Sequence, residues 1–393
     1  MALKDTGCFK CSNNNNQEWG IKRKPRYGLA GAQESSGDNN AKPVVPLIQL
    51  GIGTVGRELI EKVIGRNNRE SPGHSYCYVG FVDKSGLAVN KDGFSEEKLE
   101  EILKVKESGE KLAGIYSEKI EDIDFLEDLF EEKERGILVD VTDADKFTDH
   151  YRMALKKGWS VVLANKVPLT GVEPEEFRRL RNSSLRYEAT VGAGLPVIST
   201  LDHLKRHGEE FEELAAILSG SLSFILSRME KGMDLKEAVL EAKEKDFTEP
   251  NPAEDLLGND VARKTVILGR SLGLDLSLDD IALEPMVELE EDISSQRLEE
   301  ELEAASPDFR QRVGSAGDAG NRLRYVARIA GNKVTVGLEE VSEESPLAQG
   351  NSTANVVLFR TGNYTEPPLI VQGPGAGPEV TAGGVFSDIK RLV

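Results

Sequence analysis

The charged residues best suited to chemistry lie in two separate stretches of the sequence. In "VVLANKVPLTG", Asn165 and Lys166 follow an apolar run, and open α/β sheets bind ligands at the carboxyl ends of their strands. In "DFTEPNPAEDLLGNDVARKTVILGR", Glu249 precedes a proline and is held extended, while Asp260 and Lys264 share one helix face. The neighbouring "VILGRSLG" is apolar, which predicts partial burial of Lys264 and suits it to proton transfer. The alternatives are that Lys166 is an exposed loop lysine and that Asp260 and Lys264 form an ordinary surface ion pair.

A glycine turn after the first apolar run could hold a phosphate group. The stretch "LIQLGIGTVGRELI" places Gly51, Gly53 and Gly56 between a strand candidate and a helix candidate. In this G-x-G-x-x-G spacing, the first glycine permits a tight turn, the second lets the backbone approach a pyrophosphate, and the third allows close helix packing. The pattern predicts a dinucleotide site, with a plain strand–helix turn as the alternative.

Two further stretches are open to more than one interpretation. Asp83 ends the second predicted strand, where an acid usually bonds the ribose 2′-hydroxyl of NAD. Lys84 and Ser85 follow it and could instead hold the 2′-phosphate of NADP, so the sequence leaves that choice open. The glycines of "YEATVGAGLPVIS" could turn carbonyl oxygens outward as a cation cage, or could serve only as a crossover between domains.

The elements that must position these residues begin with an alternating pattern over residues 44–190. Strand candidates at 44–50, 75–83, 136–142, 159–165 and 185–190 alternate with helix candidates. Such alternation is typical of a parallel sheet covered by helices on both faces. We therefore predict a dinucleotide-binding domain over this range.

The remaining chain has a different texture. Residues 191–365 combine several helix candidates with two strands joined at Gly331 and Asn332, which predicts an α+β domain. Residues 366–393 read as strand, glycine loop and helix, and their "GPGAG" indicates a return to the nucleotide-binding domain. Residues 1–43 are polar and asparagine-rich, which predicts a disordered N-terminal extension.

Composition excludes several classes of partner and site. The net charge of −19 in 393 residues argues against a nucleic-acid partner, and no apolar run reaches the length of a membrane span. Three cysteines fit a reducing compartment, and Cys8 and Cys11 form a C-x-x-C without further ligands nearby. Residues 1–43 lack the apolar stretch of a secretory signal peptide, so we expect a cytoplasmic protein. The basic "KRKPR" in this segment leaves a plastid as the alternative.

Seven stretches, in this order, resemble homoserine dehydrogenase: "GIGTVGRELI", "VDVT", "ANKVPLTG", "EATVGAGLPVI", "SGSLSFIL", "TEPNPAEDLLGNDVARK" and "GPGAGPEVTAGGVFSDI". The resemblance covers nearly everything from residue 44 to residue 393. It is closest to the monofunctional, plant-like branch, because no kinase domain precedes it. It implies an α/β protein with a Rossmann-type parallel sheet domain plus an α+β catalytic and dimerisation domain, assembled as a homodimer.

The same resemblance implies roles for individual residues. Lys264 would be the proton donor and acceptor, Lys166 a second catalytic lysine beside the nicotinamide, and Glu249 and Asp260 the substrate ligands. The cofactor, NADP or NAD, would be bound by Gly51, Gly53, Thr54, Val55, Gly56, Asp83, Thr142, Lys166, Gly375 and Gly377. A structural sodium ion would be held by main-chain oxygens of Glu188, Val191, Ala193 and Leu195.

The implied activity is the interconversion of L-aspartate 4-semialdehyde and L-homoserine, a step in threonine, methionine and isoleucine biosynthesis. One rival is aspartate-semialdehyde dehydrogenase, which needs a nucleophilic cysteine, and only Cys77 lies in the part of the sequence expected to fold. The other rival is a nucleotide sensor that keeps the fold without the chemistry. It predicts loss of Lys264, Asp260 or Glu249, and all three are present.

Overall fold

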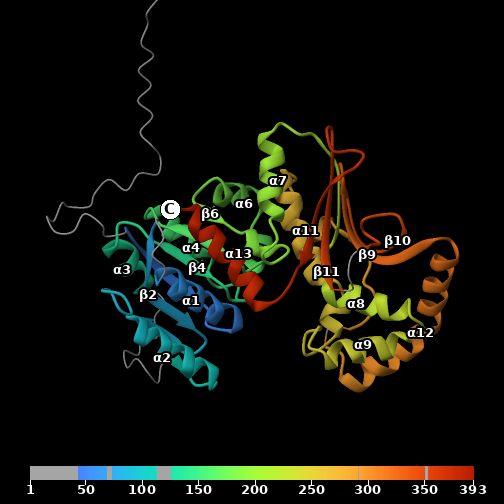
Figure 1. Ribbon diagram of the computed structural model, residues 1–393, viewed down its shortest axis with the longest axis horizontal. Coiled ribbons are helices and arrows are strands. Elements are labelled where there is room, and N and C mark those ends of the chain that lie inside the picture. Colours follow the sequence, from blue (N-terminus) through green and yellow to red (C-terminus); the bar gives the residue numbers. More distant parts are fainter. Residues whose placement is uncertain (1–42, 69–72, 113–124, 291, 350–352) are drawn as a thin grey trace, which may run out of the picture. The chain divides into compact units, whose positions relative to one another are not determined.

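The computed structural model describes residues 43–68, 73–112, 125–290, 292–349 and 353–393 (Figure 1). The disorder predicted for residues 1–43 falls almost entirely outside these ranges, and so does the C-x-x-C of Cys8 and Cys11. Within the described ranges, no helix is both long enough and apolar enough to span a bilayer.

The first sheet has six strands in the order β3-β2-β1-β4-β5-β6. They are β1 (Val44–Leu50), β2 (Ser75–Asp83), β3 (Gly86–Val89), β4 (Ile137–Asp140), β5 (Ser160–Leu163) and β6 (Leu185–Arg186). All neighbouring pairs are parallel except β2 and β3. The predicted parallel sheet is thus confirmed, with one antiparallel edge strand that the sequence did not reveal.

One predicted strand is shorter than expected. Residues 185–190 were predicted as a strand, but pairing stops at Arg186, and Glu188–Thr190 form a single 3₁₀ turn. Thr190 closes that turn by donating both its backbone N–H and its hydroxyl to the carbonyl of Tyr187. The chain therefore leaves the sheet early, and the segment that follows can turn toward the second half of the protein.

Helices follow most strands of the first sheet: α1 (Thr54–Asn67), α2 (Glu96–Glu107), α3 (Phe125–Glu132), α4 (Thr148–Lys156), α5 (Val167–Gly171) and α6 (Pro174–Arg181). The strand order reverses direction between β1 and β4, and open sheets bind ligands at such a switch point. Gly51 follows β1 there and Thr142 follows β4: a Cβ placed on Gly51 would lie 3.0 Å from Thr142 Cγ2.

The second sheet has the order β12-β11-β7-β9-β10-β8. Its strands are β7 (Phe211–Ile217), β8 (Ala282–Leu283), β9 (Asn321–Ala330), β10 (Lys333–Ser342), β11 (Ala354–Thr361) and β12 (Leu369–Pro374). The turn predicted at Gly331 and Asn332 joins β9 to β10. The α/β fold class predicted from the sequence is confirmed, although β7 and β11 were not foreseen.

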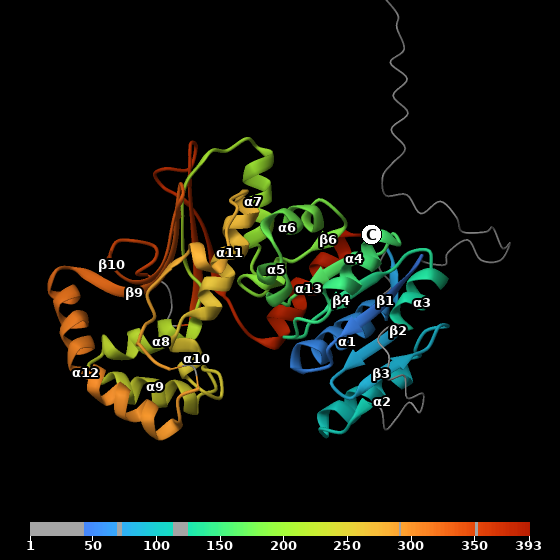
Figure 2. The same ribbon diagram turned by 180° about the vertical axis from the view of Figure 1, so that it is seen from behind.

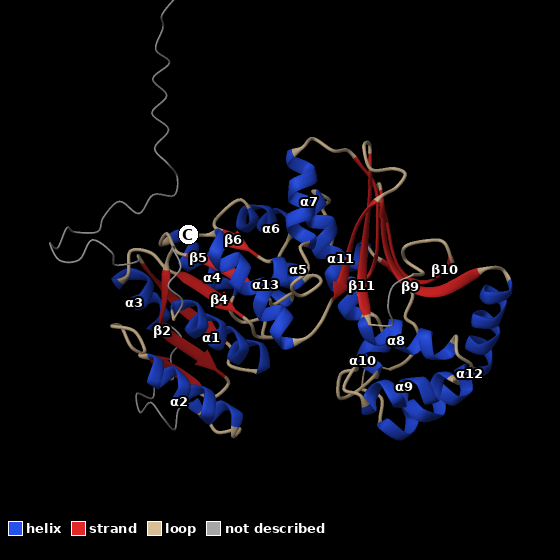
Figure 3. Ribbon diagram, viewed as in Figure 1, coloured by secondary structure: helices blue, strands red, loops and turns tan. Residues whose placement is uncertain are grey.

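Helices cover one face of the second sheet (Figure 3). Of the helices in this half, α8 (Gly220–Met229), α11 (Asn259–Leu272) and α12 (Ser295–Asp318) contact the strands. The others pack on these helices: α9 (Leu235–Glu244) on α8 and α12, α7 (Val197–Arg206) on α11, and α10 (Ala253–Leu256) on α8 and α11. Alternate sheet residues such as Leu214, Ala327 and Phe359 join the same core cluster as the helices. The acidic stretch that becomes α12 was not predicted as a helix. Its inward residues Leu298, Leu302 and Phe309 provide the buried face.

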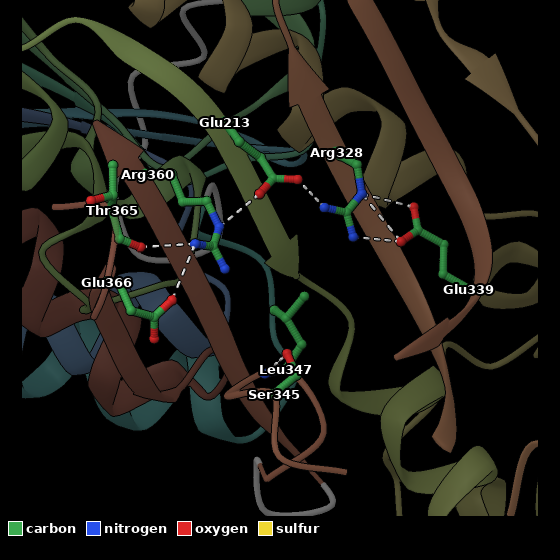
Figure 4. Close-up of polar contacts among 8 residues, drawn as sticks. All are labelled: Glu213, Arg328, Glu339, Ser345, Leu347, Arg360, Thr365 and Glu366. Carbon is green, nitrogen blue, oxygen red and sulfur yellow. Dashed lines mark hydrogen bonds and ion pairs between the residues drawn. The ribbon is translucent and has the colours of Figure 1, made fainter. Parts of the chain in front are cut away.

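The opposite face of that sheet carries a row of alternating charges (Figure 4). Arg360, Glu213, Arg328 and Glu339 come from the adjacent strands β11, β7, β9 and β10, and each is ion-paired with the next. On the same face, further along these strands, apolar residues including Ala215, Val326 and Val356 form a minor cluster.

The last helix, α13 (Pro378–Arg391), packs against α1, as both views of the ribbon show (Figures 1 and 2). Val385 and Ile389 share a core cluster with Leu59 and Val63 of α1. A Cβ added to Gly384 would lie 2.6 Å from the carbonyl oxygen of Ala193. The end of the chain thus fixes both the first nucleotide-side helix and the crossover segment near residue 193.

Candidate active site

A cavity of about 840 Å³ is lined by residues from parts of the sequence that lie far apart. Lys166, Glu249, Asp260 and Lys264, whose chemical roles remain predictions, all line it. Four further residues predicted to bind the cofactor line the same space: Val55, at the start of α1, Thr142, Gly375 and Gly377. The fold therefore unites groups that no sequence spacing could place together.

Asp260 is the centre of the charged cluster. Its Oδ2 lies 2.7 Å from Lys264 Nζ and its Oδ1 lies 3.2 Å from Lys166 Nζ. Lys264 also donates to the carbonyl of Leu218, at 2.7 Å, and its side chain is only 12% exposed. One carboxylate thus holds two ammonium groups, one from the residue that precedes α5 and one from α11.

The charge balance of this cluster sets the protonation of its acid. Burial acts to raise the pKa of Asp260, but the ammonium groups of Lys264 and Lys166 outweigh it and hold that pKa well below its ordinary value. Asp260 is therefore a carboxylate across the physiological range, which suits it to orient cations and hydroxyl groups in the cavity.

The start of α11 is shaped by a glycine. Gly258 adopts a left-handed conformation with φ of 76° as the residue before the helix, and a Cβ there would lie 2.1 Å from the hydroxyl of Tyr325. That hydroxyl donates to the carbonyl of Glu284. Further along α11, the buried Arg270 donates to the carbonyls of Leu169 and Val172, just beyond Lys166. These contacts fix the helix that carries Asp260 and Lys264.

Glu249 is positioned by an acid that sequence reasoning missed. Asp255 accepts a hydrogen bond from the Glu249 backbone N–H at 2.8 Å and from the Ser221 hydroxyl at 2.7 Å. Partial burial, together with the nearby carboxylates of Asp255, Glu254 and Asp260, raises the pKa of Glu249. A cationic ligand would relieve this repulsion, so the geometry favours an ammonium group beside Glu249.

The glycine turn satisfies each of the three predicted requirements. Gly51 has φ of 94°, which a residue with a side chain rarely adopts. Nothing lies within 4 Å of a Cβ built on Gly53, so the backbone there is open to a ligand. A Cβ on Gly56 would lie 2.4 Å from the Gly51 carbonyl, so that position must remain a glycine. The turn therefore fits a pyrophosphate at the start of α1.

A buried glutamine holds this turn in shape and was not predicted. Gln49 is fully buried, and its amide nitrogen donates to the carbonyls of Gly51 at 2.8 Å and Gly56 at 3.0 Å. Its side-chain oxygen accepts from the hydroxyl of Tyr78, which is also fully buried. A polar residue inside the apolar run "VVPLIQL" was the available signal.

A second buried network joins the ends of β4 and β5. Asp140 accepts from the backbone N–H of Thr142, the amide of Asn165 and the hydroxyl of Tyr151. Asn165 in turn accepts from the N–H of Val167. Burial raises the pKa of Asp140 and outweighs these hydrogen bonds. The network fixes the backbone on either side of Lys166, and Asp140 was not among the predicted site residues.

The chain is similar to known proteins in sequence and in fold. A family model described as homoserine dehydrogenase matches residues 196–389. A bifunctional aspartokinase/homoserine dehydrogenase from Haemophilus influenzae is 35% identical over 366 residues, covering 90% of this chain and 43% of that protein. The chain belongs to the homoserine dehydrogenase family.

Solved structures agree with this family assignment. A putative homoserine dehydrogenase from Archaeoglobus fulgidus superposes with a TM-score of 0.72 at 26% identity, covering 88% of this chain and 99% of that one. A hyperthermophilic archaeal homoserine dehydrogenase in complex with NADPH gives a TM-score of 0.69 at 29% identity, covering 89% and 97%.

The curated relatives are longer than this chain. A chloroplastic bifunctional aspartokinase/homoserine dehydrogenase from Zea mays is 41% identical over 265 residues, covering 65% of this chain and 29% of that protein. The chain spans less than half the length of these curated relatives. The family predicted from the sequence is confirmed, and the monofunctional branch stays a prediction.

The carboxylate of Asp83, which the sequence predicts to bind the cofactor, already bonds to other residues of the chain. It accepts from Lys106 Nζ at 2.7 Å and from the N–H and hydroxyl of Ser85, both at 2.6 Å. Burial acts to raise the pKa of Asp83, but the bonds from Lys106 and Ser85 outweigh it and lower that pKa. Asp83 does not line the cavity, so its role toward a cofactor stays a prediction.

The segment predicted to hold sodium has an unusual backbone. Gly192 and Ala193 both have positive φ, at 79° and 54°, and they bend residues 188–195 into a compact turn. The carbonyl of Leu195 accepts from Val197 N–H at 2.8 Å, and that of Glu188 has only a long contact of 3.4 Å from Val191 N–H. Within the described residues, no cluster of three or more acids, histidines or cysteines could hold a metal.

Gln49→Leu is expected to loosen the glycine turn. The substitution leaves the Tyr78 hydroxyl and two glycine carbonyls without their buried partner, and each unpaired group costs about 1–3 kcal/mol. Urea unfolding should show the loss in the free energy of unfolding, and dinucleotide affinity should fall with it. Adding Tyr78→Phe should recover part of the stability, because one orphan donor is then removed. Unchanged unfolding of the single variant would contradict this account.

Proposed function

We propose that this chain is a homoserine dehydrogenase, which interconverts L-aspartate 4-semialdehyde and L-homoserine with a nicotinamide cofactor. The observation that carries the proposal is the pairing of Lys166 and Lys264 with Asp260 in a cavity that also contains Glu249. The amino-acid substrate brings an ammonium, a carboxylate and a reacting oxygen, and this set of charges can receive all three. Membership of the family supports the same conclusion.

Substrate binding would use the two acids. Glu249 faces a surplus of negative charge and would pair with the ammonium group of homoserine. Asp260 would accept from the substrate hydroxyl or amino group while keeping hold of both lysines. Asp255 also lines the cavity, but its carboxylate is engaged by the backbone N–H of Glu249 and the hydroxyl of Ser221, so it would act by holding Glu249 in place.

Proton transfer would use Lys264. The bound nicotinamide supplies or accepts the hydride at the substrate carbon. Lys264 gives its proton to the oxygen that becomes a hydroxyl during reduction, and takes it back in oxidation. Its positive charge also stabilises the oxyanion that develops on that atom. The Leu218 carbonyl and Asp260 hold Lys264 Nζ in place for this step.

The rival that needs a nucleophilic cysteine finds no support at the cavity. Cys77, which alone among the described residues is a cysteine, lies in β2. Its thiol occupies the space a Cβ would take at Gly93, and burial raises its pKa. A partly buried thiol of raised pKa outside the cavity is a poor nucleophile.

Lys264→Ala is expected to lower kcat by at least about 10²-fold, the usual share of a proton donor. The assay follows the absorbance of the reduced nicotinamide with homoserine at alkaline pH. Lys245→Ala, which removes an exposed lysine paired with Glu241, serves as the matched control. Near-normal turnover of Lys264→Ala would refute the assignment of the proton donor. Absence of activity in the unmodified chain with either NAD or NADP would refute the function.

We further propose NADP as the preferred cofactor. Lys106 neutralises Asp83 at the end of β2, so the acid that would repel a 2′-phosphate is compensated. Lys84 adjoins the same position. The archaeal relative solved with NADPH supports this choice.

Lys106→Ala is expected to reduce the preference for NADPH over NADH, because it exposes an uncompensated Asp83 to the 2′-phosphate. The measurement is the ratio of kcat/KM for the two cofactors with one aldehyde substrate. Lys104→Ala, on the exposed side of α2, is the control. An unchanged ratio in Lys106→Ala would argue against this role.

Two structural roles follow from the same family assignment. We propose a sodium ion on the main-chain oxygens of Glu188, Val191, Ala193 and Leu195, supported by the left-handed residues that bend this segment. We also propose the domain division predicted from the sequence: 44–190 for the nucleotide, 191–365 for catalysis and dimerisation, and 366–393 returning to the first domain. The compartment, cytoplasm or plastid, stays a prediction; the maize relative is chloroplastic.

A homodimer is proposed through the charged face of the second sheet. The side chains of Arg328, Glu213 and Glu339 are 30%, 21% and 28% exposed in the single chain, so most of their surface is already buried. A two-fold axis places the same patch on both subunits, and a row of alternating charges can be complementary to its own copy.

Light scattering of the purified chain is expected to give twice the mass of a single chain. Arg328→Glu should shift the population toward monomers, because it sets an acid among Glu213 and Glu339 at the proposed interface. Arg310→Glu, on the exposed side of α12, should leave the mass unchanged. A monomeric unmodified chain would refute the proposal.

A further inference from the structure

Asn355, the second residue of β11, is buried with its amide nitrogen unpartnered among the described residues. The residue is 1% exposed, so bulk solvent does not reach its amide. Buried polar groups in folded proteins are paired in the large majority of cases, and an exception points to strain, a trapped water or a missing ligand. The position of this orphan donor decides among these.

The Asn355 amide packs directly against the glycine loop that lines the cavity. A Cβ added to Gly375 would lie 1.9 Å from Asn355 Cγ and 2.1 Å from its Nδ2. Gly375, Ala376 and Gly377 form one wall of the cavity. The side chain of Asn355 therefore lies immediately behind that wall and sets how far the loop can withdraw from the cavity.

The same residue lies opposite the carbonyl that holds the proposed proton donor. Val356 pairs with Ile217 in antiparallel register at the end of β7, and continuing that register by one residue sets Asn355 opposite Leu218. Directly opposite residues in an antiparallel pair project their side chains to one face. The carbonyl of Leu218 accepts the hydrogen bond from Lys264 Nζ. Asn355 is thus placed between the glycine loop and the strand end that orients Lys264.

We propose that Asn355 is a positioning residue for the dinucleotide: its free amide N–H donates to an acceptor that is in place only when the dinucleotide occupies the cavity. This rests on the proposed function, in that the cavity takes a nicotinamide dinucleotide. In the empty chain the donor is left unpaired, which opposes folding. In the loaded chain the bond forms, so part of the binding affinity comes from satisfying Asn355.

A purely structural role makes the opposite forecast. If Asn355 only fills space behind Gly375, an apolar residue of similar size does the same work, and removal of the amide leaves dinucleotide affinity unchanged. If instead Asn355 supports the fold through its amide, the same replacement destabilises the empty chain. Stability and affinity therefore separate the explanations.

Asn355→Leu is the decisive variant, because leucine is of similar size and has no donor. The empty variant should melt at the same temperature as the unmodified chain or higher, since the orphan donor is gone. Its dissociation constant for NADPH, measured by the fluorescence of the reduced nicotinamide without substrate, should rise about 10-fold or more. Asn182→Leu, an exposed asparagine at the end of α6, should change neither quantity.

The outcomes are distinct. An unchanged NADPH dissociation constant in Asn355→Leu overturns the inference, and so does a large fall in the melting temperature of the empty variant with unchanged affinity. If the leucine variant does not fold, Asn355→Ala gives the same test: weaker NADPH binding per folded molecule supports the proposal, and equal binding overturns it. An unmodified chain that binds no dinucleotide overturns this inference together with the proposed function.

Discussion

The single carboxylate of Asp260 is the interaction on which the rest of the site depends. It stands between two ammonium groups from separate helices and stays ionised because they outweigh the cost of its burial. An isolated pair of this kind on a helix surface contributes only a few tenths of a kcal/mol. Here the second lysine and the cavity walls make it an organising centre. The buried contacts of Arg270 and the left-handed Gly258 set the helix at the required place.

Around that centre, close approach of the backbone matters as much as side-chain chemistry. Gly53 leaves space where a phosphate could sit, and Gly56 removes a Cβ that would collide with the turn. At Gly375, likewise, the missing Cβ leaves the space that the amide of Asn355 fills. These glycines are placed by what lies opposite them in space, and the two loops that carry them come from opposite ends of the chain.

Buried polar groups hold these loops at some cost. Gln49 and Asp140 are enclosed among apolar strands. Gln49 satisfies two carbonyls of the glycine turn, and Asp140 satisfies the N–H of Thr142 and the side chains of Asn165 and Tyr151. A fully paired polar network in a low-dielectric interior is rigid, and rigidity keeps the catalytic groups in register. Asn355 differs because its donor is unpaired. Activity and stability then make opposite demands on one residue.

The sequence by itself determined the local features: the glycine turn, the helix face shared by Asp260 and Lys264, and most strands of the first sheet. Each depends on the spacing of a few neighbouring residues, and the regular geometry of helices, strands and tight turns determines what that spacing means in space. Tertiary structure alone decided that Lys166 reaches Asp260 and that Lys106 forms an ion pair with Asp83. It also decided that Asp255 bonds the backbone of Glu249. The antiparallel edge strand and the early end of β6 were likewise beyond local pattern. Such contacts join residues far apart in the chain, and their partners are selected by the packing of whole elements.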